Sequence, residues 1–88
     1  MTLLKLRRGR YALVEEKVPA GAKAVGVALK DLGLPDQCVI AAIIRKGQIT
    51  LPRGTSKLEE FDEVLAITDT EGAKQLAILL EPPSRPVL

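Results

Sequence analysis

The sequence has no histidine, a single cysteine and only two aromatic residues among its 88 residues. Without histidine it can build neither a Ser-His or Cys-His nucleophile system nor a histidine-centred metal site. Cys38 cannot form an internal disulfide, and its place at the start of an apolar run favours a buried structural thiol. The glycines form neither a P-loop nor a G-x-G-x-x-G turn. These absences predict that the chain is not an enzyme.

Long hydrophobic runs are missing too. The longest uncharged apolar run, from Cys38 to Ile44, is far too short to cross a bilayer, and no signal-peptide pattern is present. We therefore expect a cytoplasmic location. Eighty-eight residues make one small domain, and its core must consist of Val, Ile, Leu and Ala. Association with another subunit would add to its stability.

Positive charge is concentrated at the start of the chain. Lys5, Arg7, Arg8 and Arg10 lie in the first ten residues, and the remainder carries nine basic against eleven acidic residues. We interpret residues 1–10 as a basic arm or the remnant of a linker. Such an arm can contact phosphates or a membrane surface, but so short a run is more often a solvated tail or a domain boundary.

Apolar periodicity and turn signals predict an α+β fold. We expect two layers, with a mixed β-sheet of about four strands and helices on one side. Asp69 or Thr70 is the expected N-cap of the last helix. The strands are predicted over residues 10–19, 38–45, 48–51 and 63–68, and the helices over residues 23–32 and 70–80.

Two segments are apolar on more sides than so small a domain can cover. The strand from Cys38 to Ile44 carries apolar side chains on both faces of the pleat, and the last helix is apolar almost all round from Leu76 to Leu80. We therefore predict a homodimer. Strict alternation places Val39, Ala41 and Ile43 on one face of the strand and Ile40, Ala42 and Ile44 on the other.

Charged residues near the hairpin are the candidates for binding. Arg45, Lys46 and Arg53 bracket the hairpin, and two arginines near a turn can donate to a phosphate or carboxylate. The alternative is that Arg45 and Lys46 are only the exposed ends of a buried strand. The acidic run at residues 59–63 fits a solvated bend better than a Ca²⁺ or Mg²⁺ site, because it lacks the alternation and central glycine of an EF-hand loop.

A series of short motifs resembles the C-terminal ligand-binding domain of the TrkA or RCK family, the regulators of conductance of potassium. Their order and spacing cover nearly the whole chain, most specifically from Pro52 through Leu58 to Asp62. Phe61 departs from the pattern, because the family usually has glycine there. The motifs are Val18-Pro19, Gly33-Leu34-Pro35, Ile43-Ile44-Arg45, Gly47, Ile49 to Pro52, Gly54-Thr55, Leu58 and Asp62-Glu63-Val64-Leu65.

The resemblance implies a domain over residues 11–81, followed by a Pro-rich tail at residues 82–88. The nucleotide-binding half that usually precedes such a domain is absent, so the chain is either an excised domain or a stand-alone regulatory subunit. The resemblance implies no catalysis and no cofactor. It implies a homodimer, peripheral to a membrane, that senses a cyclic dinucleotide, another nucleotide or a cation.

In that interpretation, binding of the ligand regulates a membrane-embedded potassium channel, transporter or antiporter subunit. We predict Arg45 and Arg53 as anion donors, with Ile49 and Pro52 as apolar walls. No specific binding of nucleic acid is expected.

A DNA-binding alternative rests on another resemblance. The run KGQITLP followed by DEV resembles the swapped-hairpin proteins of the AbrB or MazE type. In that family a helical turn of about a dozen residues separates the two motifs, whereas only residues 53–61 separate them in this chain. Because that segment contains Gly54-Thr55-Ser56, a poor helix former, we favour the potassium-regulator family.

Overall fold

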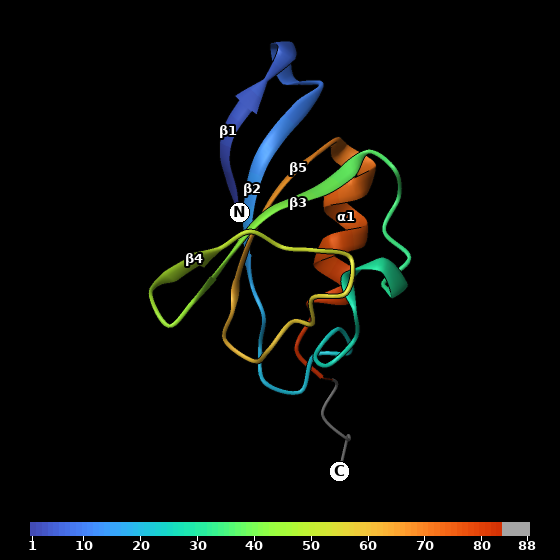
Figure 1. Ribbon diagram of the computed structural model, residues 1–88. Helices are drawn as coiled ribbons and strands as arrows, with labels where there is room; N and C mark the ends of the chain where they lie inside the picture. Colours follow the sequence, from blue (N-terminus) through green and yellow to red (C-terminus); the bar gives the residue numbers. More distant parts are fainter. Residues whose placement is uncertain (84–88) are drawn as a thin grey trace.

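A computed structural model describes residues 1–83 and shows an α+β domain with one antiparallel sheet and one α-helix (Figure 1). Along the sheet the strand order is β1-β2-β5-β3-β4, and each pair of neighbouring strands is antiparallel. Most of the predicted tail, residues 84–88, lies outside the described residues. The elements are β1 (Thr2–Leu6), β2 (Tyr11–Lys17), β3 (Cys38–Arg45), β4 (Gln48–Thr50), β5 (Glu63–Thr68) and α1 (Thr70–Leu79), with 3-10 turns η1 (Arg7–Gly9) and η2 (Leu29–Asp31).

The two-layer α+β prediction is confirmed, with two differences in the sheet. Its strands pair antiparallel instead of forming a mixed sheet, and there are five of them because β1 adds a strand that the sequence did not predict. β1 is an edge strand, and it pairs with β2 from Thr2 opposite Val14 to Leu6 opposite Tyr11. The charge run in residues 1–10 therefore belongs to a β-hairpin, with η1 at its tip.

The alternation predicted for β3 is wrong beyond its third residue, because a bulge at Ala41 interrupts the ladder. Ile40 pairs with Ala66, but Ala42 pairs with Leu65, so β3 uses one residue more than β5 over this stretch. An extra residue shifts every later side chain to the opposite face. Val39 and Ile43 consequently lie on opposite faces of the sheet.

The helix predicted over residues 23–32 is also wrong. The segment is a loop that ends in η2, and Val25 and Ala28 form isolated bridges with Leu58 and Lys57. Gly26 and Gly33 have φ of +80° and +72°, a left-handed conformation that ends helices and suits glycine. Ala24, Val25 and Leu29 of this loop pack against the core, and their positions produce the apolar spacing that indicated a helix.

The prediction of α1 is confirmed, including its cap. Asp69 precedes the helix, and its carboxylate accepts a hydrogen bond from the Gly72 backbone N–H at 2.8 Å. Gly72 is buried against the sheet, because a Cβ atom added there would overlap Thr68 Oγ1 and lie 2.9 Å from Cys38 Cβ. The absence of a side chain thus lets the first turn of α1 approach β3 and β5 closely.

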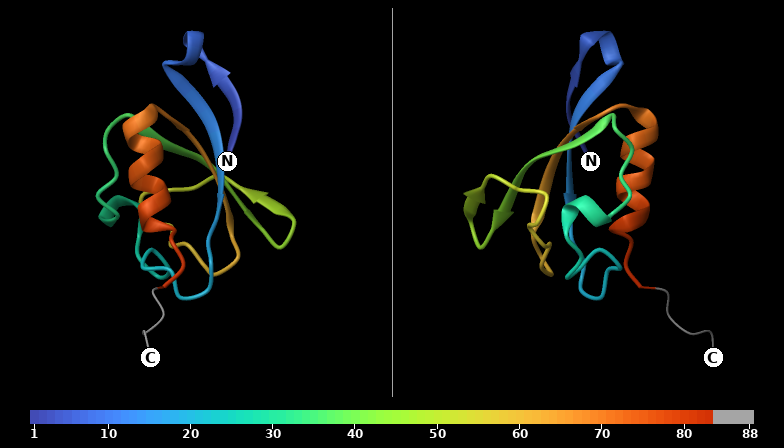
Figure 2. Two further views of the ribbon diagram at one scale, coloured as in Figure 1. Left: turned by 180° about the vertical axis from the view of Figure 1, so that it is seen from behind. Right: turned by 45° about the vertical axis from the view of Figure 1, so that its right-hand side comes forward.

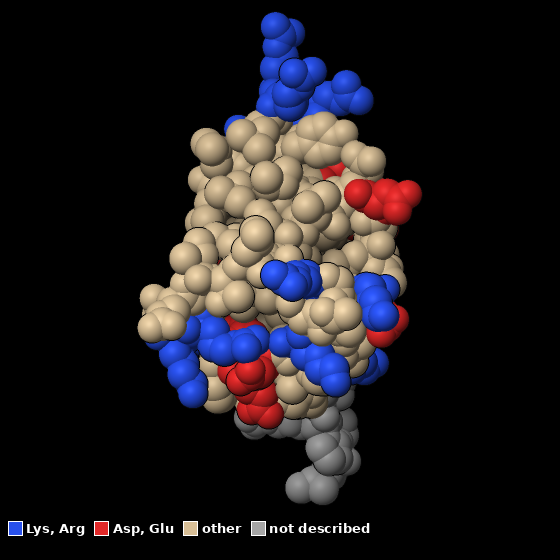
Figure 3. Space-filling model, in the orientation of Figure 1, with Lys and Arg blue, Asp and Glu red and all other residues tan. Residues whose placement is uncertain are grey.

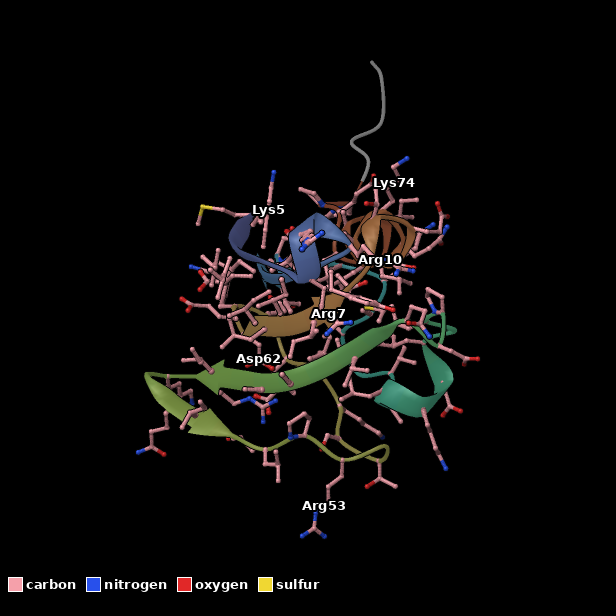
Figure 4. The ribbon with its side chains drawn as sticks, turned by 90° about the horizontal axis from the view of Figure 1, so that it is seen from above. Lys5, Arg7, Arg10, Arg53, Asp62 and Lys74 are labelled. Carbon is pink, nitrogen blue, oxygen red and sulfur yellow. The ribbon has the colours of Figure 1, made fainter. Side chains whose placement is uncertain are left out.

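The two faces of the sheet differ in what covers them. α1 and η2 lie on the same side of the strands (Figures 2 and 4), and the core residues Val64, Ala66 and Leu76 between them are fully buried. The opposite face, which we call the open face, exposes Val39 by 58% and its cross-strand neighbour Ile67 by 41%. Within residues 1–83, no helix has the length and apolar character needed to cross a membrane.

Candidate functional site

A pocket of about 330 Å³ lies on the covered side of the sheet, between β3, η2 and the loop that follows β4. Its walls combine apolar side chains with polar surface, and two basic residues, Lys30 and Arg53, contribute to its lining. Two of the four predicted site residues, Pro52 and Arg53, are therefore brought together here. The lining residues are Leu29, Lys30, Gly33, Leu34, Cys38, Ile40, Pro52, Arg53 and Gly54.

A tight turn from Arg53 to Ser56 forms one wall of the pocket. The Ser56 side chain accepts from the Arg53 backbone N–H at 2.9 Å, and the Ser56 N–H donates to the Arg53 carbonyl at 3.0 Å. Main-chain hydrogen bonds then hold the turn to η2, from Leu29 N–H to the Ser56 carbonyl and from Lys30 N–H to the Gly54 carbonyl. These bonds fix the spacing of Lys30 and Arg53 across the pocket.

The chemistry of the pocket is that of an apolar cleft with a positive rim. Lys30 and Arg53 are both exposed, and Arg53 projects from its loop into solvent (Figure 4). Ile40, Leu29 and Leu34 are partly buried beneath them. Such a site suits a ligand with an anionic group and an apolar or planar body. Lys30 escaped the sequence prediction because its segment was assigned to a helix, although it lies beside the Gly33-Leu34-Pro35 motif.

Arg45 lies outside this pocket, and its guanidinium is occupied by carboxylates of its own chain. Nε and Nη2 donate to the two oxygens of Asp62 at 2.8 Å each, and Nη1 lies 2.6 Å from a Glu59 oxygen. Nη2 also donates to the Lys57 carbonyl at 3.1 Å. The structure therefore gives Arg45 the role of a clamp on the bend before β5, and it does not bring Arg45 and Arg53 together.

Asp62 is the buried partner of that clamp, with 1% of its surface exposed. Burial by itself raises the pKa of the carboxyl, but hydrogen bonds from Arg45 and from the Glu59 backbone N–H outweigh it and hold the pKa below the ordinary value. The same hydrogen bond to Asp62 raises the pKa of Arg45. Both groups are therefore charged at neutral pH, and they form a fixed ion pair.

The other predicted residues are placed differently. Ile49 lies on β4 and is 72% exposed, opposite Ile44 and away from the pocket lining. Phe61, at the position where the family usually has glycine, has a φ of +71° and an exposed side chain, so the bend keeps the backbone that glycine favours. Burial raises the pKa of the Cys38 thiol, which supports its interpretation as a structural residue.

Comparison with known proteins identifies the domain. The family model for the TrkA-C domain matches residues 13–80. A Trk system potassium uptake protein TrkA homolog of Archaeoglobus fulgidus is 40% identical over 75 residues, which are 85% of this chain and 17% of that protein. The chain thus spans about a sixth of that relative's length.

Solved structures share the fold at lower identity. The RCK_C domain dimer of S. agalactiae BusR in complex with c-di-AMP has a TM-score of 0.69 and 21% identity, over 82% of this chain and 93% of that one. BusR bound to its busAB-promoter DNA has a TM-score of 0.69 and 18% identity, over 89% and 39%. The GsuK channel bound to NAD has a TM-score of 0.63 and 20% identity, over 81% and 14%.

With the family model covering most of the described residues, and with the same α+β architecture in these structures, the chain belongs to the TrkA-C domain family.

Proposed function

We propose that this domain is a non-catalytic regulatory module that binds a small anionic ligand as a homodimer and reports its presence to a potassium or other cation transport protein. The observation that carries the proposal is the pocket with its positive rim, formed by Lys30 and Arg53 over an apolar floor. Membership of the TrkA-C family supports the transport context, because the archaeal relative is a potassium uptake protein homolog.

The rim defines the class of ligand. Two basic side chains repel a free cation and attract a phosphate or carboxylate, and the fork of Arg53 suits a phosphate diester. Ile40 and Pro52 provide apolar surface against which a base can pack. A nucleotide or a cyclic dinucleotide therefore fits the pocket better than a metal ion. The c-di-AMP complex of BusR, a protein of the same fold, supports this choice.

A second copy of the chain is the proposed partner of the open face. Val39, Ile67 and Ile49 are exposed on this face, and contiguous exposed apolar surface on a small domain marks an interaction site. β4 is also an edge strand whose residues are all exposed. In this proposal Ile49 serves the dimer, Pro52 and Arg53 contact the ligand, and Arg45 holds the bend between them and β5.

Signalling then follows from differential affinity. A ligand changes the state of the partner protein only to the extent that it binds one arrangement of the two subunits more tightly than the other. Because the loop that carries Arg53 starts directly after β4, closure of the pocket around a ligand is mechanically coupled to the edge of the sheet. We infer that ligand binding and subunit arrangement are linked through this loop.

A thermal-shift panel of cyclic dinucleotides, adenine nucleotides and divalent cations tests the proposal. We expect an anionic nucleotide at one hundred times its Kd to stabilise the native state by about 2.7 kcal/mol through mass action. Lys30→Gln and Arg53→Gln should each reduce the shift severalfold, whereas Lys46→Gln, an exposed lysine outside the pocket, should leave it unchanged. A shift that survives both pocket substitutions would contradict this site.

The sheet topology argues against the swapped-hairpin DNA-binding alternative. β3 and β4 pair within the chain's own sheet, and β3 is flanked by β5, which is followed directly by α1. In this arrangement β3 is paired on both sides within one chain. BusR, a protein of similar fold, has been solved in complex with promoter DNA, so a mobility shift with duplex DNA is a direct test of whether this chain binds DNA.

A further inference from the structure

The tip of the β1–β2 hairpin is a compact cluster of arginines that the proposed function does not use. We propose that this tip docks onto the surface of an anionic lipid bilayer. Arg7, Arg8 and Arg10 surround one turn and together line a pocket of about 540 Å³. Figure 3 shows basic side chains alone at the outer end of this hairpin. The proposal does not depend on ligand binding in the pocket beside Arg53.

The basic side chains at the tip make few contacts with acidic residues of the described chain. Within residues 1–83, none of Lys5, Arg7 and Arg8 takes part in an ion pair, and all three are exposed. Arg10 is different, because it shares a second pocket with the acidic residues Asp69 and Glu71 at the start of α1. Arg7 and Arg8 are therefore the side chains most available to an external anion (Figure 4 labels Arg7).

The backbone conformation at the tip indicates that Arg7 and Arg8 occupy these positions because of the charge on their side chains. Arg7 and Arg8 have φ of +52° and +58°, and Gly9 follows at +87°. Glycine or asparagine adopts this left-handed conformation with little strain, whereas arginine does not. A turn selected for stability alone would place those residues at both positions. The presence of two strained arginines in one turn points to a use for their charge.

The distribution of charge favours a membrane over a nucleic acid. Nucleic-acid binding sites extend basic residues along a groove that follows the phosphates, and single strands also need aromatic stacking surfaces. The hairpin tip gathers three arginines on one turn, whereas the other exposed basic residues are scattered over the body of the domain and form no continuous track. Tyr11 beside the tip donates its hydroxyl to Gln37. Anionic lipids, which diffuse in the plane of the membrane, can gather beneath such a compact cluster.

Apolar residues on the same hairpin support the same partner. Leu3 and Leu4 on β1 are 45% and 56% exposed and lie a few residues behind the arginines. Basic side chains beside exposed leucines match the boundary between headgroups and acyl chains. A duplex offers no comparable apolar surface. The hairpin therefore combines the two features that hold a protein on a lipid surface.

Sedimentation of the full chain with vesicles tests the proposal. The vesicles contain phosphatidylcholine with 30 mol% phosphatidylglycerol, or phosphatidylcholine alone, at low and at physiological salt. We expect binding only to the anionic vesicles, with a weaker partition at higher salt. Arg7→Asn combined with Arg8→Gly should lower the partition coefficient roughly 30-fold, since each basic residue near the surface contributes about fivefold.

The substitutions are chosen so that a loss of binding cannot come from unfolding. Asparagine and glycine relieve the left-handed strain, so the double variant should melt at the same temperature as the native chain or higher. Lys17→Gln combined with Lys23→Gln removes the same charge from exposed positions on the body and should bind like the native chain. Absence of native binding to anionic vesicles, equal loss in both double variants, or tighter binding to duplex DNA than to vesicles would overturn the proposal.

Discussion

The two faces of the sheet are built from the same apolar residue types but differ in what they contact. On the covered face, the side chains of β5 pack beneath α1, and Val64, Ala66 and Thr68 are almost completely buried. On the open face, the intervening residue Ile67 and its neighbour Val39 remain exposed. β5 therefore contributes side chains both to the buried core and to an exposed apolar surface.

This difference separates residues that stabilise the single domain from residues that we propose contact a second copy of the chain. A substitution on the covered face should change the free energy of unfolding of the single chain. A substitution on the open face should leave that free energy nearly unchanged and act on association instead. The bend that Arg45 clamps lies between the two cases, because it combines a buried carboxylate with a partly exposed arginine side chain.

The largest effect is expected at the contact between α1 and the sheet. Gly72→Ala forces a Cβ atom into Thr68 Oγ1 and close to Cys38 Cβ, so the helix must move away from β3 and β5. We expect a loss of about 3 kcal/mol or more in the free energy of unfolding. Urea denaturation measures it. Gly54→Ala is the matched control, because its Cβ would meet only Lys30 Cβ at 3.6 Å, and it should stay near native stability.

A smaller loss with a pH signature is expected at the clamp. Arg45→Ala leaves the buried Asp62 carboxylate without its ion-pair partner, which should cost about 2 to 3 kcal/mol at neutral pH. Because the native pKa of Asp62 is lowered, its contribution is complete above the unfolded pKa of about 4 and is lost as the pH falls through the folded pKa.

The stability difference between the native chain and Arg45→Ala should accordingly shrink as the pH is lowered below about 4. Urea midpoints measured from pH 7 to pH 3 provide the comparison. Arg53→Ala is the control, since the exposed Arg53 side chain takes part in none of the ion pairs found within the described residues. A stability difference that is constant with pH would show that the ion pair between Arg45 and Asp62 is not the source of the stabilisation.

Local signals were sufficient for most of the fold. β5 and α1 were predicted because alternation, a polar cap at Asp69 and helical spacing all point to the same structure, and the structure confirms them. β1 is not predictable in the same way, because Thr2 to Leu6 alternate only weakly and adjoin a run of positive charge that is typical of a solvated tail. The bulge at Ala41 was missed because a run of apolar residues gives no signal for an extra residue in one strand.

Only part of the candidate site could be predicted from the sequence. Pro52 and Arg53 lie on a turn that the sequence marks with Gly54, and both line the pocket. Lys30 is brought beside them by two main-chain hydrogen bonds between segments more than twenty residues apart, which no local pattern encodes. Arg45 pairs with Asp62 for the same reason, since its partner is distant in the sequence and is fixed only by the register of β3 and β5.

The role assigned to the open face is tested most directly by sedimentation velocity at micromolar concentration, comparing the native chain with Val39→Thr combined with Ile67→Thr. The account predicts a native dimer and a variant that is monomeric yet folded, with its dissociation constant raised at least roughly tenfold, about 1.4 kcal/mol. Ile78→Thr alters the exposed apolar surface of α1, the other segment from which a dimer is predicted. Because the account places the interface on the open face, this variant should remain dimeric. A monomeric native chain, or a dimer that survives both open-face substitutions, would contradict the account.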